Sequence, residues 1–208
     1  MTEPSGAFRV LGYGSLLDPA YVRDVCGESH VHAFGRGWLH GLRRHWRLVY
    51  RNGCWDEGEY VHADSGSPFR GGIAFLGLRE EPGAEMPVSE ILVDSHALAT
   101  IDLEEYLYRR VDVRDRYLTS QERRAPRAPV WLYRDFPGDY PEGRYEGPTV
   151  VVTREYAERI AVAASELLPG GVDHFERTTD PCPWPVADLV WRSHAVDVDL
   201  DDDGEFPI

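Results

Sequence analysis

The order of the apolar segments is the feature that most restricts how this chain can fold. Short apolar runs typical of strands, such as residues 8–13 and 72–78, are mixed with segments of helical spacing, such as residues 154–168. Strands and helices do not alternate regularly, as a doubly wound parallel sheet would require. The chain is therefore predicted to have an α+β fold, in which helices flank a curled, mainly antiparallel sheet or a small β-barrel.

Capping residues mark the starts of three predicted helices. Asp18, which precedes a proline, is typical of a helix N-terminus, as are Ser95 and Thr153. The second helix is predicted to end near Glu105. The third helix is predicted to bury a face made of Tyr156, Ile160, Ala164 and Leu167. Strands are predicted at residues 8–13, 31–50, 72–78, 88–93, 108–113 and 130–133, and an exposed loop at residues 116–127.

Charge and composition exclude several kinds of function. The chain carries 22 basic and 36 acidic residues, a net charge of −14, which argues against a nucleic-acid or anionic-membrane surface. Every basic residue is an arginine, so a Schiff-base lysine and a Walker-type phosphate lysine are excluded. The three cysteines follow neither zinc-site nor disulfide-scaffold spacing, and the histidines show no metal-binding pattern. No metal and no cofactor are therefore expected.

The length favours a single domain. A chain of 208 residues can bury a complete core without a metal or disulfide. The domain is predicted to span residues 1–195, and residues 196–208, rich in acids, are predicted to be a solvated tail. No apolar run approaches the ~20 residues of a membrane span, and the polar N-terminus is unlike a signal peptide. These observations predict a cytoplasmic protein and leave its oligomeric state open.

A glycine-rich loop follows the first predicted strand. Gly12 and Gly14 allow a sharp turn that aims successive backbone N–H groups at a single point, where a carboxylate or an oxyanion can bind. The loop has neither the phosphate-loop signature nor the G-x-S-x-G signature of a nucleophile elbow. The alternative is an ordinary turn at the end of a strand.

An acidic segment ends the second predicted helix. Glu104 and Glu105 lie just before a predicted strand, where a carboxylate partly withdrawn from water has a raised pKa suited to acid–base catalysis. The alternative is a solvated acidic turn that pairs with Arg109 or Arg110. Tyr108 and Arg109 are further candidates for contacts with a ligand.

Taken together, four segments resemble the γ-glutamylcyclotransferase-like superfamily, including its plant AIG2-like branch. In chain order they are Tyr13-Gly14-Ser15-Leu16, Gly41-Leu42-Arg43-Arg44, Gly72-Ile73-Ala74-Phe75 and Asp102-x-x-Glu105-x-x-Tyr108-x-Arg110. The resemblance covers roughly the first 115 residues well, and the helix that Thr153 caps and residues 175–185 more loosely. It departs from the common pattern after Glu105, where Tyr106 replaces the glycine of many relatives.

The resemblance implies an activity and a set of site residues. In that family the loop holds the glutamyl part of the substrate, which implies ligand contacts at Tyr13, Gly14, Ser15 and Leu16, with Tyr108 beside them. The acid–base glutamate corresponds to Glu105, which keeps the three-residue spacing from Asp102, although the adjacent Glu104 leaves an alternative.

The implied reaction suits the residue types. The free α-amine of a γ-glutamyl amide or peptide attacks its own γ-carbonyl, which releases 5-oxoproline and a free amine. Because the attack is intramolecular, the enzyme needs no nucleophile, and one glutamate can act as base and then as acid. The expected partner is a small γ-glutamyl substrate. The alternative is a non-catalytic protein of the same fold that binds a small carboxylate or a peptide end. The leaving amine is not indicated, although residues 52–68, 116–127 and 175–185 are candidates for contacting it.

Overall fold

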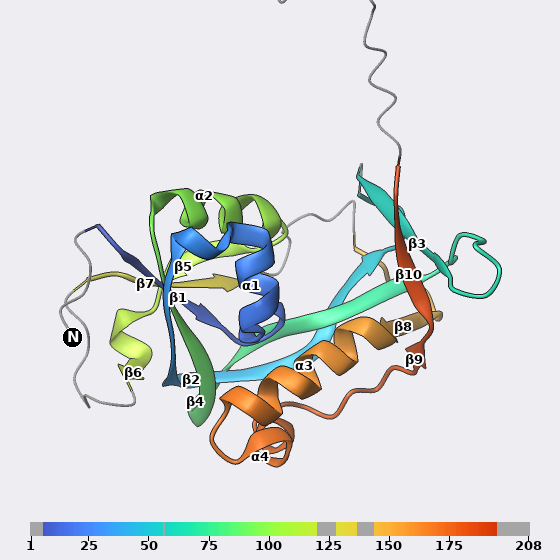
Figure 1. The fold of residues 1–208 in the computed structure, drawn as a ribbon. Coiled ribbons are helices and arrows are strands. Elements are labelled where there is room, and N and C mark those ends of the chain that lie inside the picture. The colour runs from blue at the N-terminus through green and yellow to red at the C-terminus, as the bar shows by residue number, and fades with distance from the viewer. Residues whose placement is uncertain (1–5, 56, 120–127, 137–143, 195–208) are drawn as a thin grey trace, which may run out of the picture.

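The computed structural model describes residues 6–55, 57–119, 128–136 and 144–194 and has the predicted α+β architecture (Figure 1). Its main sheet contains eight strands, with the path β5-β7-β1-β4-β2-β6, β8 beside β4 and β9 beside β8. The strands are β1 Phe8–Gly12, β2 Val31–Arg51, β4 Gly72–Val93, β5 Arg109–Asp112, β6 Tyr117–Thr119, β7 Val130–Arg134, β8 Val150–Thr153 and β9 Val186–Ala187. A separate ribbon pairs β3 Gly58–His62 with β10 Leu189–Ser193. The pairs β1–β7, β4–β8 and β8–β9 are parallel and the others antiparallel.

The described residues form four α-helices beside the sheet. They are α1 Pro19–Cys26, α2 Ser95–Glu104, α3 Arg154–Leu167 and α4 Gly171–Arg177. In Figure 1, α1 and α2 lie close together at one end of the sheet, whereas α3 lies along the long β2 and β4 strands. Short 3₁₀ turns occur at Ser15–Leu17, Glu28–His30 and Arg114–Arg116.

Two long strands replace the shorter ones predicted from the sequence. Residues 31–50 were expected to form several strands and residues 72–93 two, but β2 and β4 are each continuous. They pair from Val31↔Val93 to Arg51↔Gly72 with three register shifts, one of them at Gly41, whose φ is 74°. Bulges of this kind bend a strand without ending its hydrogen-bonded ladder, so the sheet curls strongly.

The helix caps agree with the sequence at two of three positions. The Asp18 carboxylate accepts the Ala20 N–H, and the Thr153 hydroxyl accepts the Tyr156 N–H. The prediction for Ser95 was wrong by one residue: Asp94 is the N-cap of α2 and accepts the N–H groups of the second and third helical residues. A carboxylate accepts two such bonds more readily than a serine hydroxyl, which explains the preference.

The core confirms the predicted face of α3. Ile160 and Ala164 are buried, and Tyr156 and Leu167 are partly buried against the same cluster of apolar side chains. The prediction for residues 116–127 was wrong at its start, because Tyr117 is buried in β6. The rest of that segment from residue 120, and the predicted tail at residues 196–208, lie outside the described residues. Within the described residues, no helix is long and apolar enough to cross a membrane.

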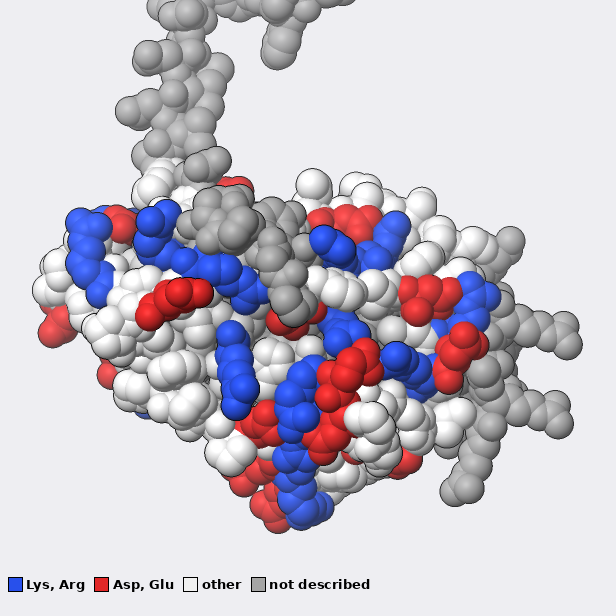
Figure 2. Space-filling model, turned by 180° about the vertical axis from the view of Figure 1, so that it is seen from behind, with Lys and Arg blue, Asp and Glu red and all other residues white. Residues whose placement is uncertain are grey.

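Charges on the far side of the molecule are mixed. On the face opposite that of Figure 1, acidic and basic side chains lie next to one another and do not separate into one continuous patch (Figure 2). Local ion pairs account for many arginines of the described residues; Glu80, for example, binds both Arg116 and Arg134 at 2.7 Å.

Candidate active site

The glycine-rich loop turns sharply where β1 ends. At Gly12 an added Cβ would lie 2.3 Å from the carbonyl oxygen of Leu16 and 2.4 Å from Ser89 Oγ, so no larger residue fits. The Ser89 hydroxyl donates to that same Leu16 carbonyl at 2.9 Å, and the Leu17 N–H donates to the Gly14 carbonyl at 2.9 Å. These contacts hold the loop tightly folded. The backbone N–H groups of Gly14 and Ser15 have no hydrogen-bond acceptor among the described residues.

The buried side chain of Arg44 supports the loop. It is completely buried in β2, and its Nε donates to the Tyr13 carbonyl at 3.0 Å, while Nη1 donates to Thr178 Oγ1 at 3.0 Å and Nη2 to the Pro87 carbonyl. Its guanidinium also lies 4.8 Å from the centre of the Phe175 ring. Burial lowers the pKa of Arg44 to about 9, so the side chain stays protonated at neutral pH. Among the described residues no carboxylate pairs with it.

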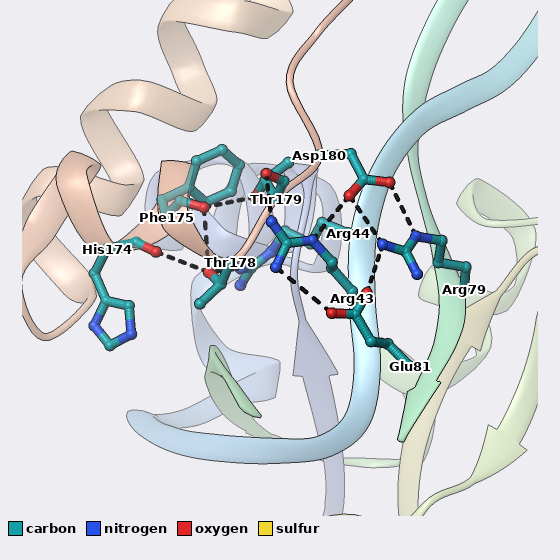
Figure 3. Close-up of polar contacts among 9 residues, drawn as sticks. All are labelled: Arg43, Arg44, Arg79, Glu81, His174, Phe175, Thr178, Thr179 and Asp180. Atoms are coloured by element: carbon teal, nitrogen blue, oxygen red, sulfur yellow. Dashed lines mark hydrogen bonds and ion pairs between the residues drawn. The ribbon is translucent and has the colours of Figure 1, made fainter. Parts of the chain in front are cut away.

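The segment that Arg44 reaches is itself anchored to the sheet (Figure 3). Asp180 accepts hydrogen bonds from Arg43 at 2.8 Å and from Arg79 at 2.9 and 3.0 Å. The two bonds from Arg79, and then the one from Arg43, lower the pKa of Asp180 to about 2. The adjacent arginines of β2 therefore have different contacts. Arg43 binds the segment that follows α4, whereas Arg44 connects the end of α4 to the glycine-rich loop.

Two groups hold the end of α2. Asp102 accepts the Arg110 guanidinium at 2.6 Å and the Tyr133 hydroxyl at 2.7 Å, which ties the last turn of the helix to β5 and β7. Glu105 is the C-cap, and its N–H donates to the Ile101 carbonyl at 2.9 Å. Arg110 thus pairs with Asp102 and leaves the Glu105 carboxylate free to face the loop.

The Glu105 carboxylate meets the loop at Ser15. Ser15 Oγ donates to Glu105 Oε1 at 3.4 Å. Burial raises the pKa of Glu105 to about 7, the charge of Glu104 adds to the increase, and the hydrogen bond from Ser15 opposes it. Glu105 still contacts solvent through an adjoining groove, so it can exchange protons near neutral pH.

A small cavity lies between the loop and Glu105. Its free volume of about 20 Å³ is room for about one water. It adjoins a groove of about 560 Å³, within the range typical of small-molecule sites. Both spaces are lined by Ser15, Glu105, Tyr108 and Tyr156. With the side chains in this arrangement, the bulk of any ligand has to lie in the groove, with these four residues at its inner end.

Two tyrosines line the cavity together with the loop. The Tyr108 hydroxyl donates to the Leu76 carbonyl at 3.2 Å, and the Tyr156 hydroxyl accepts the Leu76 N–H at 3.3 Å. Burial is the main cause that raises the pKa of both phenols above the usual range, so both stay neutral. The two tyrosines therefore present hydroxyl groups and ring surface to the cavity without charge.

The structure brings the predicted site residues together. All six, namely Tyr13, Gly14, Ser15, Leu16, Glu105 and Tyr108, line the small cavity. Arg109 does not; it is exposed, and its guanidinium lies over the Phe136 ring. Sequence reasoning missed Leu11, Leu76, Tyr133 and Tyr156 as lining residues. Tyr156 was assigned only to the buried face of α3, and no local pattern distinguishes a tyrosine that packs from one that lines a cavity. Among the described residues no group of side chains could hold a metal ion.

Comparisons with known proteins agree with this arrangement at the level of the fold. No family model and no curated protein matches the chain. Among solved structures, the chain is similar to a γ-glutamyl cyclotransferase, with a TM-score of 0.56, 14% identity and coverage of 86% of this chain and 90% of that one. It is also similar to the human uncharacterized protein loc79017, with a TM-score of 0.53, 15% identity and coverage of 86% and 91%. YkqA from Bacillus subtilis gives a TM-score of 0.55 and 15% identity over 82% of this chain and 52% of that protein.

These similarities establish the class of fold. The chain has the γ-glutamylcyclotransferase fold, with its strongly curled sheet and flanking helices. The resemblance noted in the sequence is thereby confirmed for the fold.

Proposed function

We propose that this protein is a γ-glutamylcyclotransferase-type enzyme, which cleaves a γ-glutamyl amide or peptide and releases 5-oxoproline. The observation that carries the proposal is the position of Glu105, a carboxylate with a pKa of about 7 that meets the glycine-rich loop at the inner end of a groove. The γ-glutamyl cyclotransferase fold supports the same activity at a coarser level.

The glutamyl part of the substrate is proposed to lie at the inner end of the groove, with its α-carboxylate on the N–H groups of Gly14 and Ser15. Ionised Glu105 accepts a proton from the α-amine as the amine nitrogen forms a bond with the γ-carbonyl carbon. The bond between that carbon and the leaving nitrogen then breaks, and Glu105 returns the proton to the leaving amine. The ring closes as 5-oxoproline, and the carboxylate is restored.

A raised pKa suits both halves of this cycle. A carboxylate with a pKa near the working pH is a stronger base than an ordinary glutamate and, once protonated, a usable acid. Because the substrate carries its own nucleophile, alignment of the amine and carbonyl supplies much of the rate enhancement. The rigid support of the loop by Gly12 and Arg44 is the structural basis of that alignment.

The test is release of 5-oxoproline from γ-glutamyl amines, γ-glutamyl dipeptides and glutathione by the purified chain. Glu105→Gln removes the base and keeps the shape, so turnover should fall by about 10²–10⁴-fold. Glu104→Gln is the comparison variant, because it removes an exposed charge beside the base and not the base itself, so turnover should persist when each variant is measured at its own optimum pH. Full turnover by Glu105→Gln would overturn the role of Glu105. Binding of these compounds without release, measured as a rise in melting temperature, would indicate a binding protein instead.

A further inference from the structure

The groove has an aromatic wall that starts at the reacting end. Five rings are in contact in sequence: Tyr156 with Phe75, Phe75 with Trp55, Trp55 with Tyr60, and Tyr60 with Trp191, at centroid distances of 5.3, 6.3, 6.1 and 5.1 Å. All five line the groove, and Tyr156 also lines the small cavity beside Glu105. The wall thus extends outward from the proposed site of bond cleavage.

The outer part of the wall is held in place. Both polar ends of the Asn52 side chain bind the backbone of Tyr60, each at 2.7 Å, and its Nδ2 also donates to the Phe69 carbonyl at 2.8 Å. Trp191 is opposite Tyr60 in the register of β10 and β3. It is 39% exposed, so core packing does not account for its position.

Beyond the inner end, where the N–H groups of Gly14 and Ser15 are proposed to bind the α-carboxylate, the charges around the groove disfavour a second anionic group. The lining includes the acids Glu57, Glu104 and Glu155 in addition to Glu105. Arg159 is the only basic residue among the described residues of the lining, and it already forms an ion pair with Glu155. A carboxylate on the leaving group, bound farther out in the groove, would lack a free cationic partner and would lie among like charges, which costs binding free energy.

We infer that the leaving group is an amine that carries an aromatic ring and no carboxylate. This inference rests on the proposed function and adds the substrate class. An aromatic ring placed in the groove can continue the edge-to-face contacts of the wall, each favourable beyond the area it buries. The C-terminal carboxylate of a γ-glutamyl peptide would instead meet Glu57 or Glu104.

Three substrates test the inference, because two of them each differ from the first in a single feature. γ-Glutamyl-phenethylamide has the ring without a carboxylate, γ-glutamylphenylalanine has both, and γ-glutamyl-methylamide has neither. We expect kcat/KM for the phenethylamide to exceed that for each of the other two compounds by about 10-fold or more. A factor of 10 corresponds to about 1.4 kcal/mol. A dipeptide or methylamide that is cleaved as well as the phenethylamide would overturn the inference and leave the reaction intact.

A variant of the wall makes the test specific. Trp191→Ala should lower kcat/KM for the phenethylamide at least 5-fold and should lower that for the methylamide by a clearly smaller factor. Val190→Ala is the matched control, since Val190 is similarly exposed on the same strand and does not line the groove. An equal loss with both substrates would contradict the inference.

Failure of the proposed function gives a different result. If none of the three compounds releases 5-oxoproline, binding is measured by quenching of tryptophan fluorescence. Preferential binding of the phenethylamide would then overturn the reaction and support the ligand class. Absence of both release and binding would overturn both proposals.

Discussion

Ser15 Oγ lies 3.4 Å from Glu105 Oε1, although 90 positions separate the two residues in the sequence. A hydroxyl that donates to the ionised carboxylate lowers the pKa of Glu105, in opposition to burial and to the charge of Glu104. The working pKa of about 7 is therefore a balance of identifiable contributions.

Two substitutions should move that balance in opposite directions. Ser15→Ala removes the stabilising bond, so the pKa of Glu105 should rise, and the limb of the pH–rate profile that reports the ionised base should move to higher pH. Glu104→Gln removes a like charge, so the same limb should move to lower pH. The measurement is kcat/KM for 5-oxoproline release against pH. Shifts in the same direction would contradict the assignment of this limb to Glu105.

The raised pKa of Glu105 should also appear in the stability of the fold. The folded protein holds a proton on Glu105 up to about pH 7, whereas the unfolded chain loses it near the ordinary value of 4.5. Between these values the folded state binds more protons, so the contribution of Glu105 to the free energy of unfolding falls as pH rises. Glu105→Gln lacks this loss, so its free energy of unfolding should rise relative to that of the parent protein as the pH increases to 7. The difference should be at most about 3 kcal/mol, and smaller because the carboxylate contacts solvent. Urea unfolding at pH 4 and pH 8 measures the difference, and a constant offset would argue against a raised pKa.

Glycine is required at position 12 for reasons of space. Gly12→Ala would place Cβ against the Leu16 carbonyl and Ser89 Oγ, so the loop has to shift. We expect a loss of about 2–4 kcal/mol in the free energy of unfolding and a fall in turnover. Gly35→Ala is the control, because its Cβ would meet only ordinary contacts, the closest at 3.7 Å. Equal stability of the two variants in urea would show that the loop can rearrange to accommodate the added Cβ, which would contradict the requirement for glycine.

The buried guanidinium of Arg44 should matter more than that of its neighbour. Arg44→Met leaves the Tyr13 and Pro87 carbonyls without a buried donor, and we expect a loss of about 3–5 kcal/mol. Arg43→Met breaks a network that is partly exposed to solvent and should cost less. Arg44→Lys keeps the charge but cannot reach all three acceptors, so its stability should lie between those of the parent protein and Arg44→Met. Midpoints of urea unfolding compare the three variants, and a smaller loss for Arg44→Met than for Arg43→Met would contradict the role of Arg44.

Local patterns were sufficient for most of the elements. The caps at Asp18 and Thr153 and the buried face of α3 are short-range features, since they depend on residues within a few positions of one another. The continuity of β2 and β4 was not predictable in this way. A glycine that usually ends a strand can instead form a bulge when a partner strand supplies the ladder, and Gly41 does so against β4.

The sequence by itself determined the order of the elements, the sharp turn at Gly12 and Gly14, and the residue types that carry the proposed chemistry. Only the tertiary structure decided that Glu105 faces Ser15, that Asp102 takes up Arg110, and that Trp55, Tyr60 and Trp191 share one groove. The physical reason is that burial, pKa and groove shape depend on groups distant in the chain. Their contributions exist only when the curled sheet brings the ends of β1, α2 and β10 to one place.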